Sequence, residues 1–375
     1  MDFSFSDDQN AIRELAAQIL RDGSAPERLR ALEKRVAAGE TERFDPALWR
    51  AAGEAGLIGL AIPEAQGGGG QGFLELALVV EQLGRTTAPI PYLESALLCA
   101  LPLAEFGSKA QRERWLPQLA TGEAIGTAAL LDAQADAPTR ARKQGTGWKL
   151  SGAKLCVPAG QLAQLVLVPA ALPDGRESVF LVEAASAGLR ATALPTTSSQ
   201  PEAKLAFDDL ALPAGALLGG EGQGAEIRAW LELRATAALC ALASGVCEEA
   251  LRRTAEFSKT RKQFDQPIAM FQAVGHREAD AFIDTEAVRL TAWQACWRIA
   301  EGLPAEDQVA IAKFWAAEGG QRVVHAAQHI HGGIGVDREY PVHRYFLYAK
   351  QLELTLGGAT PQLVRLGRRI AEAAT

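Results

Sequence analysis

Residues 325–335 read HAAQHIHGGIG, and a helical pattern of apolar residues stops within them. Gly332 and Gly333 carry no Cβ atom, so their backbone N–H groups can approach a ligand phosphate, and Gly335 extends the same permissive path. These glycines follow a predicted helix, whereas the dinucleotide fingerprint GxGxxG follows a strand and opens a helix. Two interpretations stay open: an anion-binding turn, and an ordinary glycine cap at a helix end.

Helical patterns surround this turn on both sides. Residues 226–258 are rich in Ala, Leu and Cys on several faces, and no proline occurs between Pro213 and Pro267. This pattern predicts one long buried helix. Further helices are predicted at residues 271–301, 305–331, 341–356 and 362–374. Because short connections between long helices favour antiparallel neighbours, we expect a C-terminal four-helix bundle over residues 216–375.

Short strands are predicted before the bundle, because β-branched or alternating runs are separated there by Gly, Pro, Asp and Ser. The runs lie at residues 148–157, 163–168, 178–182, 188–194 and 203–207, and they predict a small antiparallel β domain over residues 126–215. Earlier in the chain the apolar spacing is helical, at residues 6–21, 45–57, 73–83, 93–106 and 109–119. We therefore expect a mainly α fold with a middle β domain, in which residues 1–125 form an N-terminal α-helical domain.

The composition is that of a globular protein. Of 375 residues, 48% are hydrophobic and 22% are charged, which is enough to bury a core. The net charge of −7 argues against a partner nucleic acid. Five cysteines without a CxxC pair predict buried free thiols in a reducing compartment. With no secretory leader and no run of about 18 apolar residues, we expect a cytoplasmic protein without a membrane span.

The order α, β, α, together with five motifs in sequence, resembles the acyl-CoA dehydrogenase family over essentially the whole chain. The first motif, LWRAAGEAGLIGLAIPEAQGGGGQGFLELALVVEQLGR, is similar to the family's helix–turn–helix with its PE-xx-GG turn. WLPQLATGE resembles the entry into the β domain, and WKLSGAKLCVPAG resembles the strand that edges the flavin. RKQFDQPIAMFQ is similar to RxxFGxxIxxFQ, and HIHGGIG to QxxGGxG.

The resemblance implies an FAD-dependent enzyme that dehydrogenates the α and β carbons of an acyl-CoA thioester. A carboxylate base takes the α-proton while hydride leaves for the flavin. By position, Arg261 would bind the FAD pyrophosphate through two parallel hydrogen bonds, and Phe264 and Gln272 would contact the adenosine half. The residues alone leave a second interpretation open, in which Arg261 lies on a solvated helix end beside Lys259 and Lys262.

Several positions depart from the family pattern. Asp265 replaces the glycine that follows the phenylalanine, which adds a negative charge near the predicted diphosphate. His329 replaces the glutamine of a turn that, in the family, reaches a neighbouring subunit's FAD, and it can still donate a hydrogen bond. On the flavin-edge strand, Val157 and Pro158 stand where the family has Ile-Thr or Ile-Ser. Pro158 has neither an N–H nor a hydroxyl group for the usual contact to the flavin.

We predict a structural role, not a functional one, for the histidines near residue 329 and for Asp132. His325 and His329 are four residues apart and share a helix face, which suggests a metal site. Since no carboxylate or cysteine accompanies them and His331 falls off that face, we predict no metal. Asp132 is the only acid near the position of the family's substrate-loop glutamate, and we interpret it as a solvated loop acid.

The catalytic base is the largest departure. Three positions carry the base in different family members, and here they hold Leu356, Gly358 and Ala235, none of which accepts a proton. Glu232 lies one turn before Ala235, and Glu353 lies one turn before Leu356. Each is a candidate base, and each has a simpler interpretation as a surface ion-pair partner.

Two functions follow from the resemblance. The first is an active acyl-CoA dehydrogenase with a displaced base. The second is a non-catalytic partner subunit that completes the FAD site of a glutamate-bearing chain. A flavin oxidase or monooxygenase on the same scaffold is a third option. In each dehydrogenase case we expect FAD, an acyl-CoA substrate, an electron-transfer flavoprotein or similar acceptor, and a homo- or hetero-oligomer.

Overall fold

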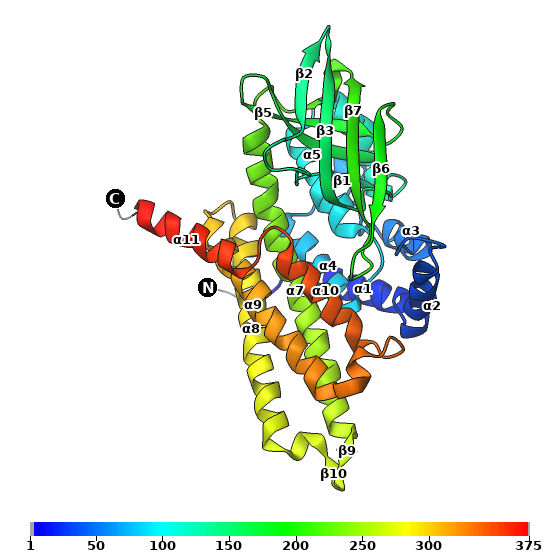
Figure 1. Ribbon diagram of the computed structural model, residues 1–375, viewed down its shortest axis with the longest axis vertical. Helices are drawn as coiled ribbons and strands as arrows, with labels where there is room; N and C mark the ends of the chain where they lie inside the picture. The colour runs from blue at the N-terminus through cyan, green and yellow to red at the C-terminus, as the bar shows by residue number, and fades with distance from the viewer. Residues whose placement is uncertain (1–3, 374–375) are drawn as a thin grey trace. The chain divides into compact units, whose positions relative to one another are not determined.

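The computed structural model describes residues 4–373 (Figure 1). Within that range, helices lie at both ends of the chain and an eight-stranded sheet lies between them in sequence. This confirms the predicted fold class. The chain divides into two compact units, each built from separate stretches: unit 1 is Met1–Lys34, Phe73–Ala88 and Leu233–Thr375, and unit 2 is Arg35–Gly72 and Pro89–Glu232. The domain boundaries after residues 125 and 215 stay predictions.

The first helices begin at capping residues that their own sequences supply. Ser6 and Gln9 exchange side chain-to-backbone hydrogen bonds, and this capping box starts α1 (Asp7–Gly23). Asp45 accepts hydrogen bonds from two N–H groups at the start of α3 (Pro46–Glu54). α2 (Pro26–Ala37) escapes prediction because charged residues dominate its sequence. The helices that follow are η1 (Glu64–Gln66), α4 (Phe73–Thr86), the π-helix η2 (Leu93–Ala100), α5 (Leu101–Phe106) and α6 (Lys109–Thr121).

The sheet belongs to unit 2 and has the strand order β6-β7-β3-β2-β4-β5-β8, with β1 paired to β4. Most neighbouring strands run antiparallel, as predicted, but β1 and β2 each pair with β4 in parallel. β1, β2 and β8 escape prediction because β1 and β8 have only three and two residues and β2, RARKQ, is almost entirely polar. The strands are β1 (Gly126–Ala128), β2 (Arg140–Gln144), β3 (Gly147–Pro158), β4 (Leu165–Ala171), β5 (Glu177–Glu183), β6 (Leu189–Leu194), β7 (Glu202–Leu212) and β8 (Leu217–Leu218), with η3 (Ala214–Ala216) before the last.

Long helices build unit 1, and all five predicted C-terminal helices are present (Figure 1). α9 packs against α8, α10 and α11, while α4 packs against α1 and α8. Ala374, the last residue of the predicted final helix, lies outside the described residues. The helices are α7 (Gly224–Thr260), α8 (Gln272–Ala300), α9 (Glu306–His331), α10 (Val342–Leu354) and α11 (Ala359–Ala373), with short 3₁₀ turns at η4 (Ile268–Met270) and η5 (Gly332–Val336).

Two glycines allow α4 and α7 to touch backbone to backbone. A Cβ atom added at Gly84 would lie 2.1 Å from the carbonyl oxygen of Leu242, and one added at Gly245 would lie 2.0 Å from that of Glu81. Neither contact leaves room for a side chain. The Glu81 carboxylate accepts a hydrogen bond of 3.2 Å from the Trp293 indole, and burial raises its pKa.

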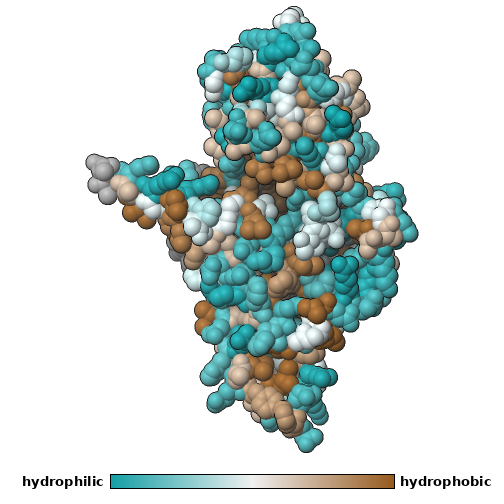
Figure 2. Space-filling model, viewed as in Figure 1, coloured by the Kyte–Doolittle hydropathy of each residue, from teal (hydrophilic) through white to brown (hydrophobic). Residues whose placement is uncertain are grey.

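Two helices, α7 and α11, differ in how much of their apolar side the rest of the protein covers. α7 is the one helix among residues 4–373 that is long and apolar enough to cross a membrane, and 78% of its most apolar window is buried, as in a core helix. α11 instead leaves one apolar side uncovered, and Figure 2 shows hydrophobic residues along one edge of it and hydrophilic residues along the other. Leu363, Val364 and Ile370 are 49%, 47% and 61% exposed.

Candidate functional site

The end of α7 carries the segment predicted to bind FAD. Arg261 follows the last helical residue, and its N–H donates to the Phe257 carbonyl oxygen at 2.8 Å. A hairpin of β9 (Lys262–Gln263) and β10 (Gln266–Pro267) comes next, joined by Phe264 and Asp265 with φ of 52° and 63°. Positive φ at both positions defines a type I′ turn, which favours glycine at the second. Asp265 therefore holds a left-handed conformation that the family's glycine adopts without strain.

The predicted FAD-contacting side chains of this segment face solvent. Phe264 is 89% exposed, and its ring meets the Phe271 ring edge-on at 6.2 Å between centroids. Arg261 is exposed, and so is Gln272, the first residue of α8. A ring that is 89% exposed adds little to the core, and its contact with the adenosine half of FAD stays a prediction.

The glycine turn lies against the same helix, one turn before Arg261. The His331 ring stacks on the Phe257 ring at 4.4 Å, and its Nε2 meets the Tyr340 hydroxyl at 3.3 Å. Burial lowers the pKa of His331. The structure thus brings the motif at residues 329–335 and the segment after α7 to one end of the bundle.

The glycines themselves cap α9 and leave space above them. Gly332 has φ of 61°, and its N–H donates to the carbonyl oxygens of Gln328 and His329. Added Cβ atoms at Gly332 and Gly333 would meet nothing within 4 Å, whereas one at Gly335 would lie 3.1 Å from the Gln328 oxygen. The glycine-cap interpretation is therefore correct, and the exposed position of Gly333 leaves the ligand role as a compatible prediction.

His325 and His329 of α9 have different surroundings. His329 is exposed, while the Nδ1 of His325 meets the Gln321 carbonyl oxygen at 2.8 Å. Within residues 4–373, no group of three or more His, Cys, Asp or Glu side chains is arranged to hold a metal ion.

The predicted flavin-edge strand in unit 2 is irregular at its end. The pairing of β3 with β7 shifts between Lys154 and Val157, and Cys156 there has φ of 49°. This bulge turns the Cys156 thiol to the surface, so the prediction that all five cysteines are buried is wrong for Cys156. Val157 is buried, and the Pro158 carbonyl oxygen accepts a hydrogen bond of 2.6 Å from the Thr127 hydroxyl.

Asp132 is not the solvated loop acid that we expected. Its carboxylate lies 2.9 Å from the ammonium group of Lys154, whose side chain is 2% exposed, and it accepts a hydrogen bond of 2.8 Å from the Thr139 N–H. A buried ammonium group needs a counter-charge, and Asp132 supplies it. The expectation was wrong because the partner lies 22 residues further along the chain, on β3.

Sequence patterns also gave no sign of Glu94. It lies in the π-helix η2, a distortion that is frequent at functional sites. Burial raises the pKa of its carboxyl group to about 7, and the nearby charge of Glu202 contributes to the rise. A carboxyl group with this pKa can gain or lose a proton near neutral pH.

The turn after α10 holds two of the three expected base positions. Leu356 has φ of 56° and Gly357 has φ of 91°. Lys313, which is 1% exposed, donates to the carbonyl oxygens of Leu352 and Glu353 at 2.5 and 3.2 Å. Gln362 donates to the Leu356 carbonyl oxygen at 3.0 Å. Two side chains thus hold a turn that presents leucine and glycine rather than an acid.

Both candidate bases lie in local ion pairs. Glu353 contacts the Lys350 ammonium at 2.5 Å, and Glu232 contacts the Arg228 guanidinium at 3.5 Å. Their side chains are 22% and 33% exposed. The third base position, Ala235, is buried on α7. No carboxylate therefore occupies any of the three positions.

Comparison with known proteins settles the family. The model described as "Acyl-CoA dehydrogenase, N-terminal domain" matches residues 6–123, and "Acyl-CoA dehydrogenase, C-terminal domain" matches residues 222–371. The chain belongs to the acyl-CoA dehydrogenase family. It is 42% identical to "Acyl-CoA dehydrogenase FadE27" of Mycobacterium tuberculosis over 380 residues, covering 99% of each chain.

Two solved structures are similar to the chain over nearly its whole length. A chain of the ChsE4-ChsE5 complex from Mycobacterium tuberculosis shares 43% identity, with a TM-score of 0.93 and 99% of each chain covered. A chain from a variant of the Tcur3481-Tcur3483 steroid ACAD shares 40% identity, with a TM-score of 0.89, covering 98% of this chain and 99% of that one. The protein is accordingly an FAD-dependent acyl-CoA dehydrogenase, an oxidoreductase.

Proposed function

We propose that this acyl-CoA dehydrogenase works as one subunit of a heteromer and that a second, glutamate-bearing chain supplies the base. The observation that carries the proposal is the set Leu356, Gly358 and Ala235 at the three base positions. Removal of an α-proton requires a positioned acceptor, and these side chains have none. The nearest acids, Glu232 and Glu353, are held in ion pairs with Arg228 and Lys350.

In this proposal the chain's own residues hold the cofactor and position it. FAD, when bound, accepts the hydride from the acyl chain. Arg261 would bind the diphosphate of FAD, and Phe264 and Gln272 would contact its adenosine half. The Gly332–Val336 turn would bind the diphosphate of the FAD held by the neighbouring subunit. His329 would donate a hydrogen bond beside that turn. Val157 and Pro158 would pack at the flavin edge without a hydroxyl contact.

The exposed apolar side chains of unit 1 support association with another chain. Four on α8 are at least 36% exposed, as are three on α11, and monomeric proteins rarely expose such contiguous groups. The relatives named ChsE4-ChsE5 and Tcur3481-Tcur3483 are two-component proteins by name. The side chains are Phe282, Ile283, Leu290 and Trp297 on α8 and Leu363, Val364 and Ile370 on α11.

The substrate we propose is the CoA thioester of a steroid side chain, because a 40% identical relative is named a steroid ACAD, an acyl-CoA dehydrogenase. The electrons would pass to an electron-transfer flavoprotein, and the reaction would take place in the cytoplasm.

The test compares the full-length chain expressed alone with the chain co-expressed with a glutamate-bearing family member. Alone, we expect a folded protein with little flavin and no turnover. Together, we expect a yellow complex with about one FAD per site that reduces its flavin on addition of steroid acyl-CoA. A chain that alone binds stoichiometric FAD and turns over at the rate of the complex would contradict the proposal.

A displaced base is the second candidate, and the position of Glu353 one turn before Leu356 favours it. Glu232→Gln, Glu353→Gln and Glu94→Gln would each keep the shape of the side chain and remove its proton-accepting oxygen. A drop of at least 100-fold in turnover with unchanged flavin content would identify the base. If all three variants stay active in the co-expressed complex, the partner chain is left as the source of the base.

A further inference from the structure

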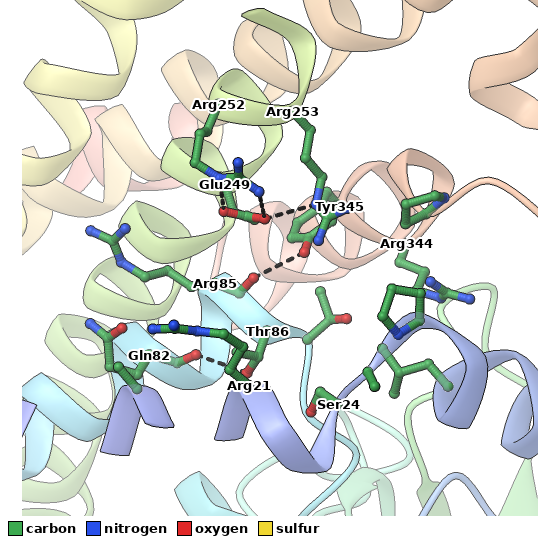
Figure 3. A pocket seen from close by; sticks show the side chains of 16 residues that line it. Arg21, Ser24, Gln82, Arg85, Thr86, Glu249, Arg252, Arg253, Arg344 and Tyr345 are labelled. Carbon is green, nitrogen blue, oxygen red and sulfur yellow. Dashed lines mark hydrogen bonds and ion pairs between the residues drawn. The ribbon is translucent and has the colours of Figure 1, made fainter. Parts of the chain in front are cut away.

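A cavity of about 460 Å³ lies wholly within unit 1, and none of its lining residues is among those assigned to the flavin (Figure 3). Its walls come from the end of α1, the start of α2, the end of α4, the last third of α7 and the start of α10. Five of its side chains are arginines, and one is a glutamate. They are Arg21, Arg85, Arg252, Arg253, Arg344 and Glu249.

The arginines are only partly neutralised. Arg85 pairs with Glu248, and Arg344 pairs with Glu33. Arg252 and Arg253 share Glu249, at 2.7 and 2.8 Å. Arg21 has no ion-pair partner among residues 4–373. Three glutamates therefore face five arginines, and two positive charges are left over around the cavity.

Two polar atoms of the wall lack the partners that burial demands. Neither the Ser24 hydroxyl nor the buried Nε–H of Arg85 has a hydrogen-bond partner in the described part of the chain, and Ser24 is only 8% exposed. An unsatisfied buried donor costs about 1–3 kcal/mol, so it is kept where something else binds it. Each of these groups could donate a hydrogen bond to the oxygen of a bound anion.

Other parts of the wall are apolar. Ala17, Ala25, Pro26, Leu29 and Pro341 line it, and the ring of Tyr345 lies beneath the Arg253 guanidinium at 5.5 Å. A bare phosphate ion would leave this wall in water. A cavity of this volume suits a ligand with both an anionic group and a ring or short apolar portion.

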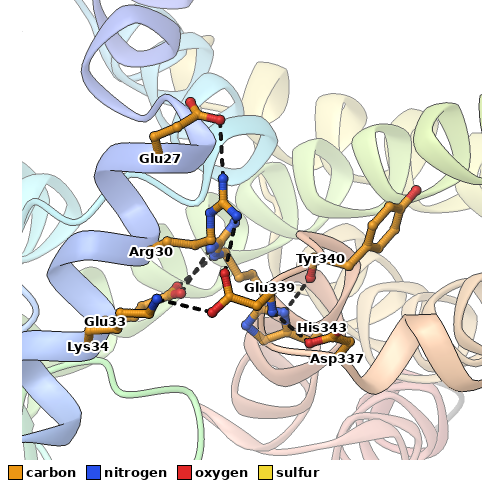
Figure 4. Close-up of polar contacts among 9 residues, drawn as sticks. Glu27, Arg30, Glu33, Lys34, Asp337, Glu339, Tyr340 and His343 are labelled. Carbon is orange, nitrogen blue, oxygen red and sulfur yellow. Dashed lines mark hydrogen bonds and ion pairs between the residues drawn. The ribbon is translucent and has the colours of Figure 1, made fainter.

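Polar contacts hold the arginine side in place. The Tyr345 hydroxyl donates to the Arg85 carbonyl oxygen at 2.9 Å, and Arg344 makes a two-pronged contact with Glu33 at 2.6 and 2.9 Å. Next to that contact, Glu339 joins Arg30 and Lys34 of α2, each at 3.2 Å (Figure 4). These contacts tie α2 to the start of α10, so the cavity is formed before a ligand arrives.

We propose that this cavity binds an organic phosphate, a small molecule that joins a phosphate group to a ring or apolar portion. The phosphate would lie among Arg21, Arg85 and Arg252 and accept from Ser24, because guanidinium groups match phosphate oxygens in geometry and charge. The ring would lie on the apolar wall. This inference does not depend on the proposed function, since none of these residues belongs to the flavin segment or to the base positions.

The probe is ADP, titrated calorimetrically into the full-length protein after reconstitution with stoichiometric FAD, and flavin absorbance shows that FAD is not displaced. The test variant is Arg21→Gln with Arg252→Gln. Arg21 has no ion-pair partner among residues 4–373, and Glu249 keeps Arg253 after the change, so the fold is retained. The control is Arg365→Gln with Arg368→Gln on α11, which removes the same charge elsewhere.

We expect ADP to bind to the wild type and the control with equal affinity, and at least tenfold more weakly to the test variant. Pyrophosphate should bind more weakly than ADP, and adenosine should not bind. Equal ADP affinity in wild type and test variant would overturn the site. If the control variant loses as much ADP affinity as the test variant, ADP is held by general charge attraction and the proposed site is wrong. Pyrophosphate binding as tight as that of ADP would overturn the organic ligand class.

Discussion

The segment after α7 and the turn after α10 keep different parts of the family's chemistry. After α7, the side chains predicted to contact FAD remain, exposed on a hairpin whose backbone is strained at Asp265. After α10, the backbone support remains, through Lys313 and Gln362, but the acid is gone. A turn held by hydrogen bonds from other helices does not need its own side chain to keep its shape. Catalytic groups can therefore disappear while the frame that presented them persists.

Restoring the acid should give the largest effect. Leu356→Glu places a carboxylate on the intact turn, and we expect turnover of acyl-CoA by the FAD-loaded chain to rise by about 100-fold or more. Leu356→Gln, which has the same size and no basic oxygen, is the control. The readout is the rate of flavin bleaching on mixing with substrate. Equal rates in the two variants would show that the frame no longer aims at the substrate.

Removing the support should destabilise the turn. Lys313→Met leaves the carbonyl oxygens of Leu352 and Glu353 without their donor in a buried place. We expect the free energy of unfolding to fall by about 2–4 kcal/mol in urea titrations.

Lys350→Met serves as the matched control, because Lys350 is 35% exposed and forms a local ion pair. We expect a loss below about 1 kcal/mol there. If both variants lose the same stability, Lys313 does not have the supporting role described.

The hairpin should respond in flavin binding rather than in stability. Arg261→Ala removes a charged donor from an exposed position, and we expect FAD to dissociate about tenfold more readily, which corresponds to the loss of one charge-assisted hydrogen bond. The flavin-to-protein ratio after extended dialysis measures this. Lys262→Ala, at the next residue, should leave the ratio unchanged. An unchanged ratio in Arg261→Ala would refute the diphosphate assignment.

Changing Asp265 should have the smallest effect. Asp265→Asn removes the charge near the predicted diphosphate, and we expect FAD affinity to rise by a factor of about three. Asp265→Gly also relieves the left-handed backbone and should add about 1 kcal/mol of stability. Thermal melting measures the change in stability, and flavin titration measures the change in FAD affinity. Weaker FAD binding in both variants would mean that the carboxylate contributes a contact of its own.

How far the sequence predicts the structure depends on how local the cause is. Ser6 and Asp45 start helices through atoms two or three residues away, so their roles follow from sequence. The Asp132–Lys154 pair depends on an isolated bridge between β3 and the loop that follows β1, and the exposed Cys156 depends on the bulge in the pairing of β3 with β7. No local pattern encodes either contact.

The same reasoning explains the sites. Arg261, Phe264 and Gln272 lie within one contiguous motif, and the structure places them on one exposed segment. The arginine cavity instead draws its arginines from four separate helices, one each from α1, α4 and α10 and two from α7, and no single sequence motif contains them. The pKa of Glu94 depends on burial, which only the fold supplies.

The glycine contact between α4 and α7 has a consequence for synthesis on the ribosome. Gly84 and its partner Leu242 are separated by 158 positions in the chain. At about 5–20 residues per second, α4 leaves the ribosome roughly 10–30 s before the helix that must cover it. During that interval its buried side chains Leu76, Val80 and Leu83 have no α7 to pack on. The nascent chain therefore passes through a stage in which these apolar side chains lack the cover of α7, whatever the stability of the finished protein.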